Sequence, residues 1–263
     1  MESHSISSQD NLRLRVFAGP NGSGKSTVIQ FVRDQEVNGR KIDFGIYINA
    51  DDIAKKLRER AFTFNDYDIV TSNKEFTHTA LASGLIGREF NDIAFKKAYS
   101  FKEGNVKLRD KTSDERLSQI IADFLRKKIL TEKKKFSFET VFSHSSKLDV
   151  MREAASMGYK VYLYFVSTEN PEINKFRVAS RKTKGGHDVP NDKIESRYYR
   201  SLDLLFEAAQ IAYQVFFFDN SKDGESFKMF AHFKKNGNKK KWDKLNKKDV
   251  PNWFEEYYSA KVK

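Results

Sequence analysis

The sequence predicts an α/β fold in which a parallel β-sheet is wrapped by helices. Three observations lead to this prediction. Apolar segments of strand length alternate with helical segments along most of the 263 residues. Several of these strands are apolar throughout, as strands buried on both faces are. A glycine-rich turn also separates the first strand from the first helix, and the 39% hydrophobic content is enough to form a core between the layers.

The first strand, LRLRVFA at residues 12–18, runs into GPNGSGKST, and TVIQFVRD then has the apolar spacing of a helix. Between strand and helix the sequence fits the phosphate-binding pattern G-x-x-x-x-G-K-[ST]. Backbone N–H groups at the helix N-terminus face the phosphates, Lys25 bridges the β- and γ-phosphates, and the Ser26 hydroxyl binds Mg²⁺. The sequence thus predicts a P-loop NTPase or kinase fold that binds ATP and Mg²⁺ through Gly19, Pro20, Asn21, Gly22, Ser23, Gly24, Lys25, Ser26 and Thr27.

A second strand, FGIYINA at residues 44–50, stops at Asp51 and Asp52, and a helix continues from there. This order is typical of a carboxylate at the C-terminal edge of a parallel sheet. Asp51 is the candidate general base, because phosphoryl transfer needs a carboxylate that orients and deprotonates the accepting hydroxyl. The alternative is that one of the two aspartates only caps the helix.

Residues 62–111 are too apolar for a linker and partly helical in pattern, so a helical insertion is expected there. The next helix, 112–130, has its apolar residues on one face and Thr112 or Ser113 as its cap. Further on, a helix that ends at Gly158 precedes an apolar strand at 159–167.

Glu139 ends the strand FSFET at residues 136–140, on the edge of the sheet where Asp51 is expected. There it can bind substrate hydroxyls or a water on Mg²⁺. Alternatively, it only caps the following helix.

Basic residues share helical faces between Lys175 and Arg200. Arg177 and Arg181 are four residues apart, and Arg197 and Arg200 lie on the face of a long helix from about Asp192 to Ala212. The turn GGHDVP joins the two segments, which suits a lid whose arginines stabilise a transferring phosphoryl group. A solvated basic helix is the alternative.

The chain ends in a strand at 215–221, an expected hairpin around Asn236 and Gly237, and a short helix. We expect a kinase domain over 12–221, which includes the insertion, with 222–263 packed on the same domain. Of the net charge of +12, residues 234–248 carry +7, from eight lysines and one acid. This stretch is either a solvated hairpin or a nucleic-acid contact.

Composition excludes several classes of protein. No cysteine is present, which excludes disulfides and thiolate metal sites. No apolar run of membrane-spanning length and no secretory segment is found, so a cytoplasmic protein without membrane contact is expected.

Six motifs, in this order, resemble the zeta-toxin family of P-loop kinases: GPNGSGKST, INADDIAKKL, FSFETVFS, RVASRKTKGGHDVP, RYYRSLDLLFEA and DNS. They cover about 17–60 and 113–221. The resemblance implies an ATP- and Mg²⁺-dependent kinase that phosphorylates a sugar hydroxyl, in type members that of a UDP-amino sugar, and that a partner antitoxin neutralises. It assigns catalysis to Lys25, Asp51, Arg181 and Arg197, and substrate contacts to Asp51, Glu139, Thr140, Arg177, His187 and Arg200.

The sequence departs from the family where two consecutive threonines are expected after the strand acid, because Thr140 is followed by Val141. Three functions therefore stand: a small-molecule kinase, a polynucleotide or tRNA kinase that the lysine-rich hairpin would serve, and a non-catalytic module that closes on ATP.

Overall fold

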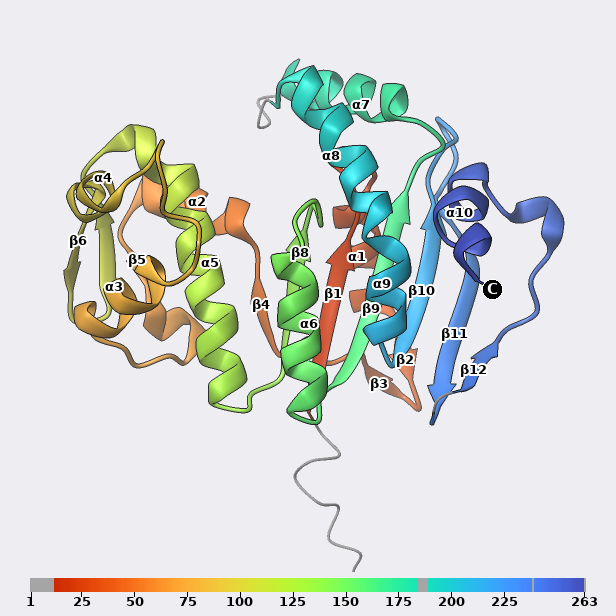
Figure 1. The fold of residues 1–263 in the computed structure, drawn as a ribbon, viewed down its shortest axis with the longest axis horizontal. Helices are drawn as coiled ribbons and strands as arrows, with labels where there is room; N and C mark the ends of the chain where they lie inside the picture. Colours follow the sequence, from red (N-terminus) through yellow and green to blue (C-terminus); the bar gives the residue numbers. More distant parts are fainter. Residues whose placement is uncertain (1–11, 184–188, 238, 263) are drawn as a thin grey trace, which may run out of the picture. The chain divides into compact units, whose positions relative to one another are not determined.

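The computed structural model describes residues 12–183, 189–237 and 239–262. The chain divides into two compact units, one formed by Met1–Gly45 with Ser137–Lys263 and the other by Ile46–Phe136. Figure 1 labels their helices and strands. In the described part, no helix is both long enough and apolar enough to span a bilayer.

A mostly parallel β-sheet forms the centre of the first unit (Figure 1). Its strands follow the order β12-β11-β10-β9-β1-β8. The β1–β9 and β9–β10 pairs are parallel, whereas β10–β11 and β11–β12 are antiparallel. Their bounds are β1 Arg13–Ala18, β8 Phe136–Thr140, β9 Lys160–Ser167, β10 Gln214–Asp219, β11 Lys228–Asn236 and β12 Lys239–Trp242. The α/β class with a parallel sheet is confirmed.

Helices cover both faces of this sheet. Rings of α10 pack on one face, where Phe254 contacts Phe217 and Trp253 contacts Phe165, and α6 and α9 contact β9. On the other face, α1 reaches Phe218 through a chain of edge contacts from Phe31 to Phe227. The helices are α1 Lys25–Asp34, α6 Ser146–Ser156, α7 Pro171–Thr183, α8 Asn191–Asp203, α9 Leu205–Ile211 and α10 Asn252–Tyr257, and a small hairpin is formed by β2 Glu36–Val37 and β3 Arg40–Lys41.

The second unit begins with β4 (Ile46–Ile48) and α2 (Ala50–Glu59), and α2 packs along α5 (Asp114–Thr131). Between them lie β5 Phe62–Thr63, α3 Asn73–Leu81, α4 Asp92–Ala98, β6 Tyr99–Lys102 and β7 Asn105–Leu108. The helical insertion expected at 62–111 contains α3 and α4, but strands were missed, because β5, β7 and β6 form a small antiparallel sheet beside the helices. The sheet buries Phe62 and Val106 completely.

The missed hairpin has a local signal. Lys102 pairs with Asn105, and the two residues between them, Glu103 and Gly104, both have positive φ, of 49° and 74°. Two consecutive left-handed residues form the turn that matches the twist of a tight hairpin. The glycine inside the alternating segment YSFKEGNVKL was therefore the sign of a turn.

Other element bounds differ from the expected ones. The long helix at 192–212 is two helices, α8 and α9, separated at Leu204. Ser113 stands at the N-cap of α5 without accepting a cap hydrogen bond, since its hydroxyl donates to Asp110. The C-terminal hairpin is confirmed, but Asn236 pairs with Lys239 and belongs to β11, so the turn begins at Gly237.

Candidate functional site

The loop between β1 and α1 has the geometry of a phosphate-binding loop. Gly24 is the N-cap of α1 with φ 91° and ψ 21°, and the N–H groups of Thr27 and Val28 both bond to its carbonyl. Lys25 is the first residue of the helix. A helix leaves its first N–H groups without intrahelical partners, and these bind anions.

Two glycines leave no room for a side chain. A Cβ on Gly19, whose φ is 145°, would lie 2.0 Å from the carbonyl oxygen of Val166. A Cβ on Gly24 would lie 2.2 Å from the side-chain nitrogen of Asn220. The glycines of the motif are therefore required by close neighbours in β9 and after β10, as well as by the turn.

Two asparagines from distant segments hold the loop. The Asn220 side chain donates to the Ser23 carbonyl at 2.9 Å, and the Asn174 side chain, completely buried in α7, donates to the Asn21 carbonyl. The hydroxyl of Thr168 donates to Asn174. Sequence reasoning did not single out these asparagines as site residues. The DNS motif contains Asn220, but no local pattern marks Asn174.

Arg177 supports the same region. Its guanidinium donates to the carbonyl of Asn220 at 2.6 Å and to the carboxylate of Asp223 at 2.8 Å. It therefore orders the segment that carries Asn220. Its expected contact with substrate stays a prediction.

Lys25 lies between the loop and β8. Its ammonium donates to the Pro20 carbonyl at 2.9 Å and lies 3.9 Å from a carboxylate oxygen of Glu139. Both side chains are largely buried. The alternative that Glu139 caps the next helix is wrong, because α6 begins only at Ser146. The acid at the end of β8 instead faces the lysine of the phosphate-binding loop.

Thr140 has a local structural partner. Its hydroxyl accepts the N–H of Phe142 at 3.0 Å, and Phe142 has a positive φ of 60°. The bond stabilises a bend in the chain directly after β8. The hydroxyl proton of Thr140 remains able to donate to a ligand.

The residues present fit a nucleotide with its metal. Ser26 and Thr27 are exposed in the first turn of α1, and the loop glycines form a cradle that a Cβ would fill. Among the described residues, no group of three or more His, Asp or Glu could hold a metal by itself. In P-loop proteins the metal is bound by the Ser or Thr hydroxyl together with phosphate oxygens.

The two basic helices pack against each other through Val178, Val189 and Ile194. Lys175 of α7 also bonds Glu195 of α8 at 2.6 Å, and the carboxylates of Glu172 and Glu195 raise the pKa of this lysine to about 12. The two helices are thus tied together. The predicted His187 lies outside the described residues.

The predicted arginines of these helices differ in environment. Arg181 is exposed on α7, and Arg197 is half-buried on α8. Arg200 is exposed and donates to the carbonyl and hydroxyl of Ser196 on its own helix. The roles of all three in phosphoryl transfer stay predictions.

Asp51 and Asp52 belong to the second unit, in the first turn of α2. The alternative that one of them caps this helix is wrong, because Asn49 is the N-cap and its side chain accepts the N–H of Asp51 at 2.9 Å. Both carboxylates are exposed and favourably placed at the positive end of the helix. The role of Asp51 as a base stays a prediction.

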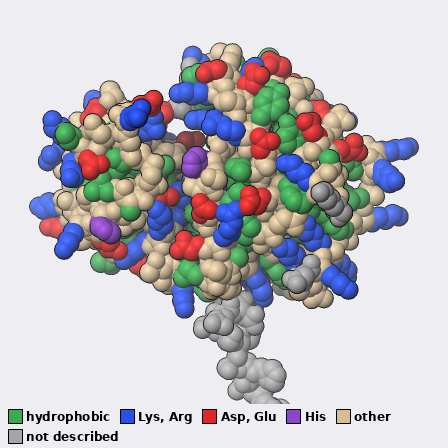
Figure 2. All heavy atoms as spheres, viewed as in Figure 1, with side chains coloured by type: hydrophobic (Ala, Val, Ile, Leu, Met, Phe, Trp, Pro, Cys, Tyr) green, Lys and Arg blue, Asp and Glu red, His purple; other side chains and the backbone are tan. Residues whose placement is uncertain are grey.

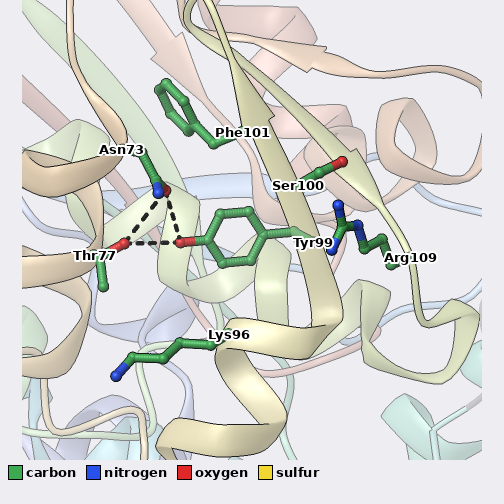
Figure 3. A pocket seen from close by; sticks show the side chains of 7 residues that line it. All are labelled: Asn73, Thr77, Lys96, Tyr99, Ser100, Phe101 and Arg109. Atoms are coloured by element: carbon green, nitrogen blue, oxygen red, sulfur yellow. Dashed lines mark hydrogen bonds between the residues drawn. The ribbon is translucent and has the colours of Figure 1, made fainter.

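A pocket of about 370 Å³ lies within the second unit, between α3, α4 and the strands β6 and β7 (Figure 3). At its centre the hydroxyls of Thr77 and Tyr99 are 2.9 Å apart, and both donate to Asn73. Lys96 and Arg109 lie on opposite sides of the tyrosine in Figure 3. The lining of the pocket combines two cationic side chains, Lys96 and Arg109, with polar and aromatic ones.

The parallel sheet, the glycine loop between β1 and α1, and a lysine at the start of that helix together define a P-loop nucleotide-binding fold. No family model matches the chain. A Haemophilus influenzae protein described as uncharacterized is 32% identical over 63 residues, which is 24% of this chain and 45% of that protein.

Solved structures extend the comparison to the whole fold. The chain superposes on the crystal structure of AvrRxo1-ORF1:AvrRxo1-ORF2 with sulphate ions with a TM-score of 0.52 and 14% identity, over 96% of this chain and 65% of that chain. For the same complex with ATP the TM-score is 0.51, with 14% identity, over 97% and 66%. The chain thus spans about two thirds of those chains. The expected α/β P-loop fold is thus shared with these solved chains.

Proposed function

We propose that this chain is an ATP-dependent kinase of zeta-toxin type, which transfers the γ-phosphoryl group to a hydroxyl of a sugar such as a UDP-amino sugar. The observation that carries this proposal is the phosphate-binding loop, with Lys25 placed between the Pro20 carbonyl and Glu139. The proposal is also supported by the fold shared with a complex that was solved with ATP.

In this proposal the loop residues 19–27 bind the phosphates of ATP and the Ser26 hydroxyl binds Mg²⁺. ATP supplies the phosphoryl group that is transferred. The positively charged ammonium of Lys25 stabilises the negative charge of the phosphates. Glu139, beside that ammonium, offers a carboxylate oxygen to a substrate hydroxyl.

Asp51 is the proposed general base, which takes the proton of the attacking hydroxyl. Arg181 and Arg197 are proposed to stabilise the charge that spreads over the transferring group, because guanidinium groups bind phosphoryl oxygens at two points. Arg177, Arg200, His187 and Thr140 complete the proposed substrate contacts.

An antitoxin is the proposed protein partner. The AvrRxo1-ORF1 structures of this fold were solved as complexes with ORF2. A partner that covers the acceptor side of the site would lower transfer from ATP, so co-purification with a second protein that suppresses transfer would support the idea, and full transfer in that complex would contradict it.

The position of the lysine-rich hairpin argues against a polynucleotide kinase. Lys234 pairs with Gln214 at the start of β10, whereas Asn220, which contacts the phosphate-binding loop, follows the end of that strand. The six residues of β10 separate these two ends by about 17 Å. Lys234, Lys235 and the lysines of β12 thus lie at the end of the sheet away from the loop.

The test is transfer from γ-labelled ATP to a panel of UDP-sugars, free sugars, nucleosides and RNA, with identification of the labelled product. We expect a labelled UDP-sugar with the wild type and loss of transfer by at least 100-fold in Asp51→Asn. Asp52→Asn is the matched control, since it makes the same change one residue along the same exposed helical turn.

The outcomes separate the candidates. Full transfer by Asp51→Asn would contradict the assignment of the base, and loss in Asp52→Asn alone would move that role to its neighbour. ATP binding by calorimetry without any labelled product would refute the kinase and favour a non-catalytic module that closes on ATP.

A further inference from the structure

The register of the C-terminal hairpin separates its lysines into two sets. Lys235 pairs with Lys240, and both side chains lie on the face of the sheet that α10 covers. The Lys240 ammonium is 5.0 Å from the ring centre of Phe233 and 3.0 Å from the Tyr258 hydroxyl, and Lys235 donates to the carbonyl of Gln210. Burial lowers the pKa of both lysines. This set therefore supports packing and is not offered to a partner.

The other set points to the opposite face. Lys234 pairs with Lys241, and Asn236 pairs with Lys239. This line of cross-strand partners continues from β11 into β10 and β9, because Lys234 pairs with Gln214 and Gln214 pairs with Tyr162. Paired residues of neighbouring strands project to the same side of a sheet. We call this surface the basic sheet face, and its residues are Lys160, Tyr162, Gln214, Lys234, Lys239 and Lys241.

The basic sheet face is open along the strands β9 to β12. On the α10 side of these strands Leu163, Val215 and Phe233 are completely buried. On the basic side Tyr162 and Gln214 remain half-exposed, and Lys234, Lys239 and Lys241 are exposed. The only described helix packed on that side, α1, contacts Phe218 at the other end of β10 through Phe227.

Negative charge is nearly missing from this surface. None of the described strand residues that the register places beside the six is a carboxylate, and the nearest one after β12 is Asp243, whose N–H bonds to the carbonyl of His232. A carboxylate oxygen of Asp243 lies 2.8 Å from Nδ1 of His232. The four lysines of the face thus create a positive potential that favours a polyanion.

Aromatic rings lie among the lysines. Lys160 and Lys234 reach over the ring of Tyr213, at 5.9 Å and 5.6 Å, and Tyr162 contacts this ring edge to face. Tyr213 is itself half-exposed. Proteins that bind single strands combine two elements: basic side chains that contact the phosphates and aromatic rings on which bases stack. An acidic protein segment would use the lysines but would gain little from the rings.

We propose that the basic sheet face binds single-stranded nucleic acid, with Lys160, Lys234 and Lys241 on the phosphates and Tyr213 against a base. The three inter-strand steps from β9 to β12 span about 14 Å, which a strand of roughly four nucleotides covers. The face lies at the edge of the sheet away from the phosphate-binding loop, so this binding is separate from phosphoryl transfer.

The test is fluorescence anisotropy of labelled 12-residue oligo(U) and oligo(dT) with the full chain at low salt. The double variant Lys234→Glu/Lys241→Glu removes two cations of the face. Its control, Lys247→Glu/Lys248→Glu, makes the same change in charge at exposed positions beyond the paired strands. Figure 2 shows cationic side chains, drawn blue, over the segment that follows β12.

We expect the face variant to weaken binding at least tenfold and to reduce the slope of log K against log salt by about 1.4, the value for two phosphate contacts on a single strand. The control variant is expected to change Kd less than threefold. Tyr213→Leu is expected to weaken binding at least fivefold, whereas Tyr199→Leu, at an exposed tyrosine of α8, is expected to have no effect.

Binding of both oligonucleotides supports recognition of single-stranded nucleic acid in general, and binding of oligo(U) alone assigns the face to RNA. Absence of binding by the wild type would overturn the proposal, as would equal loss in the control variant, which would indicate attraction by net charge only. Tighter binding of poly-glutamate than of either oligonucleotide, unchanged in Tyr213→Leu, would assign the face to an acidic protein instead. ATP binding measured on the same variants shows that the first unit is intact.

Discussion

The contact between Gly24 and Asn220 allows a quantitative test of how the phosphate-binding loop is held. In Gly24→Ala the new Cβ lies 2.2 Å from the side-chain nitrogen of Asn220 and 3.3 Å from its Cγ. The left-handed backbone, with φ 91°, costs an alanine about 1–2 kcal/mol. The collision adds about 1–3 kcal/mol. The single variant should thus lose about 2–5 kcal/mol of unfolding free energy.

Asn220→Ala removes the hydrogen bond to Ser23, which contributes about 0.5–1.5 kcal/mol. It also removes the atoms with which the Cβ collides. The double variant should therefore lose unfolding free energy through the backbone strain and the missing hydrogen bond, but not through the collision. We expect its loss of stability to be smaller than the sum of the two single losses by about 1–3 kcal/mol.

Urea unfolding followed by tryptophan fluorescence provides the assay, because Trp242 and Trp253 are the only tryptophans and both lie in the first unit. Gly158→Ala is the matched control, since Gly158 has φ 87° with nothing within 4 Å of its Cβ position. It should lose only the strain of about 1–2 kcal/mol. Losses that add within about 0.5 kcal/mol would refute the proposed contact.

Three further predictions follow from single contacts. The hydrogen bond from Lys128, at 2.6 Å, lowers the pKa of Glu75 below 4.5, so the stability it adds is present above pH 4.5 and is lost as pH falls through the lowered value. Glu75→Gln should cost about 0.5 kcal/mol at pH 7, and its denaturation curve should coincide with wild type in acid. Trp253→Phe removes the indole bond to Asp219, about 1 kcal/mol, and should lower Tm by about 2–4 °C. Glu139→Gln removes a negative charge beside the phosphate site and should tighten ATP binding about threefold in calorimetry, whereas weaker binding would show that the carboxylate is needed to position the lysine.

Local sequence was sufficient for the phosphate-binding loop. Glycines in left-handed conformations, a lysine at the first helical position and apolar segments on either side depend on neighbours in the chain, so their pattern predicts them. The asparagines that hold this loop were not predicted as such, because Asn174 and Asn220 reach it from 153 and 197 residues away. Nothing in their own surroundings marks that contact.

The insertion illustrates the opposite error. Its helices were predicted from their pattern, but the strands β5, β6 and β7 are only two to four residues long, and the turn glycine between β6 and β7 was their main local signal. Strand pairing joins Phe62 to Val106 across the segment. Such pairing depends on side chains that meet only after folding.

The sequence by itself determined that this chain holds a phosphate-binding loop between a strand and a helix in a parallel α/β sheet, since these features follow from spacing along the chain. Only the tertiary structure decided which lysines of the hairpin are buried and which are exposed. Lys234, Lys235, Lys240 and Lys241 are chemically identical in the sequence, and the register of β11 against β12 sends one pair under α10 and the other to the open face. The physical reason is the alternation of side chains across a sheet, whose two faces become different only when helices cover one of them.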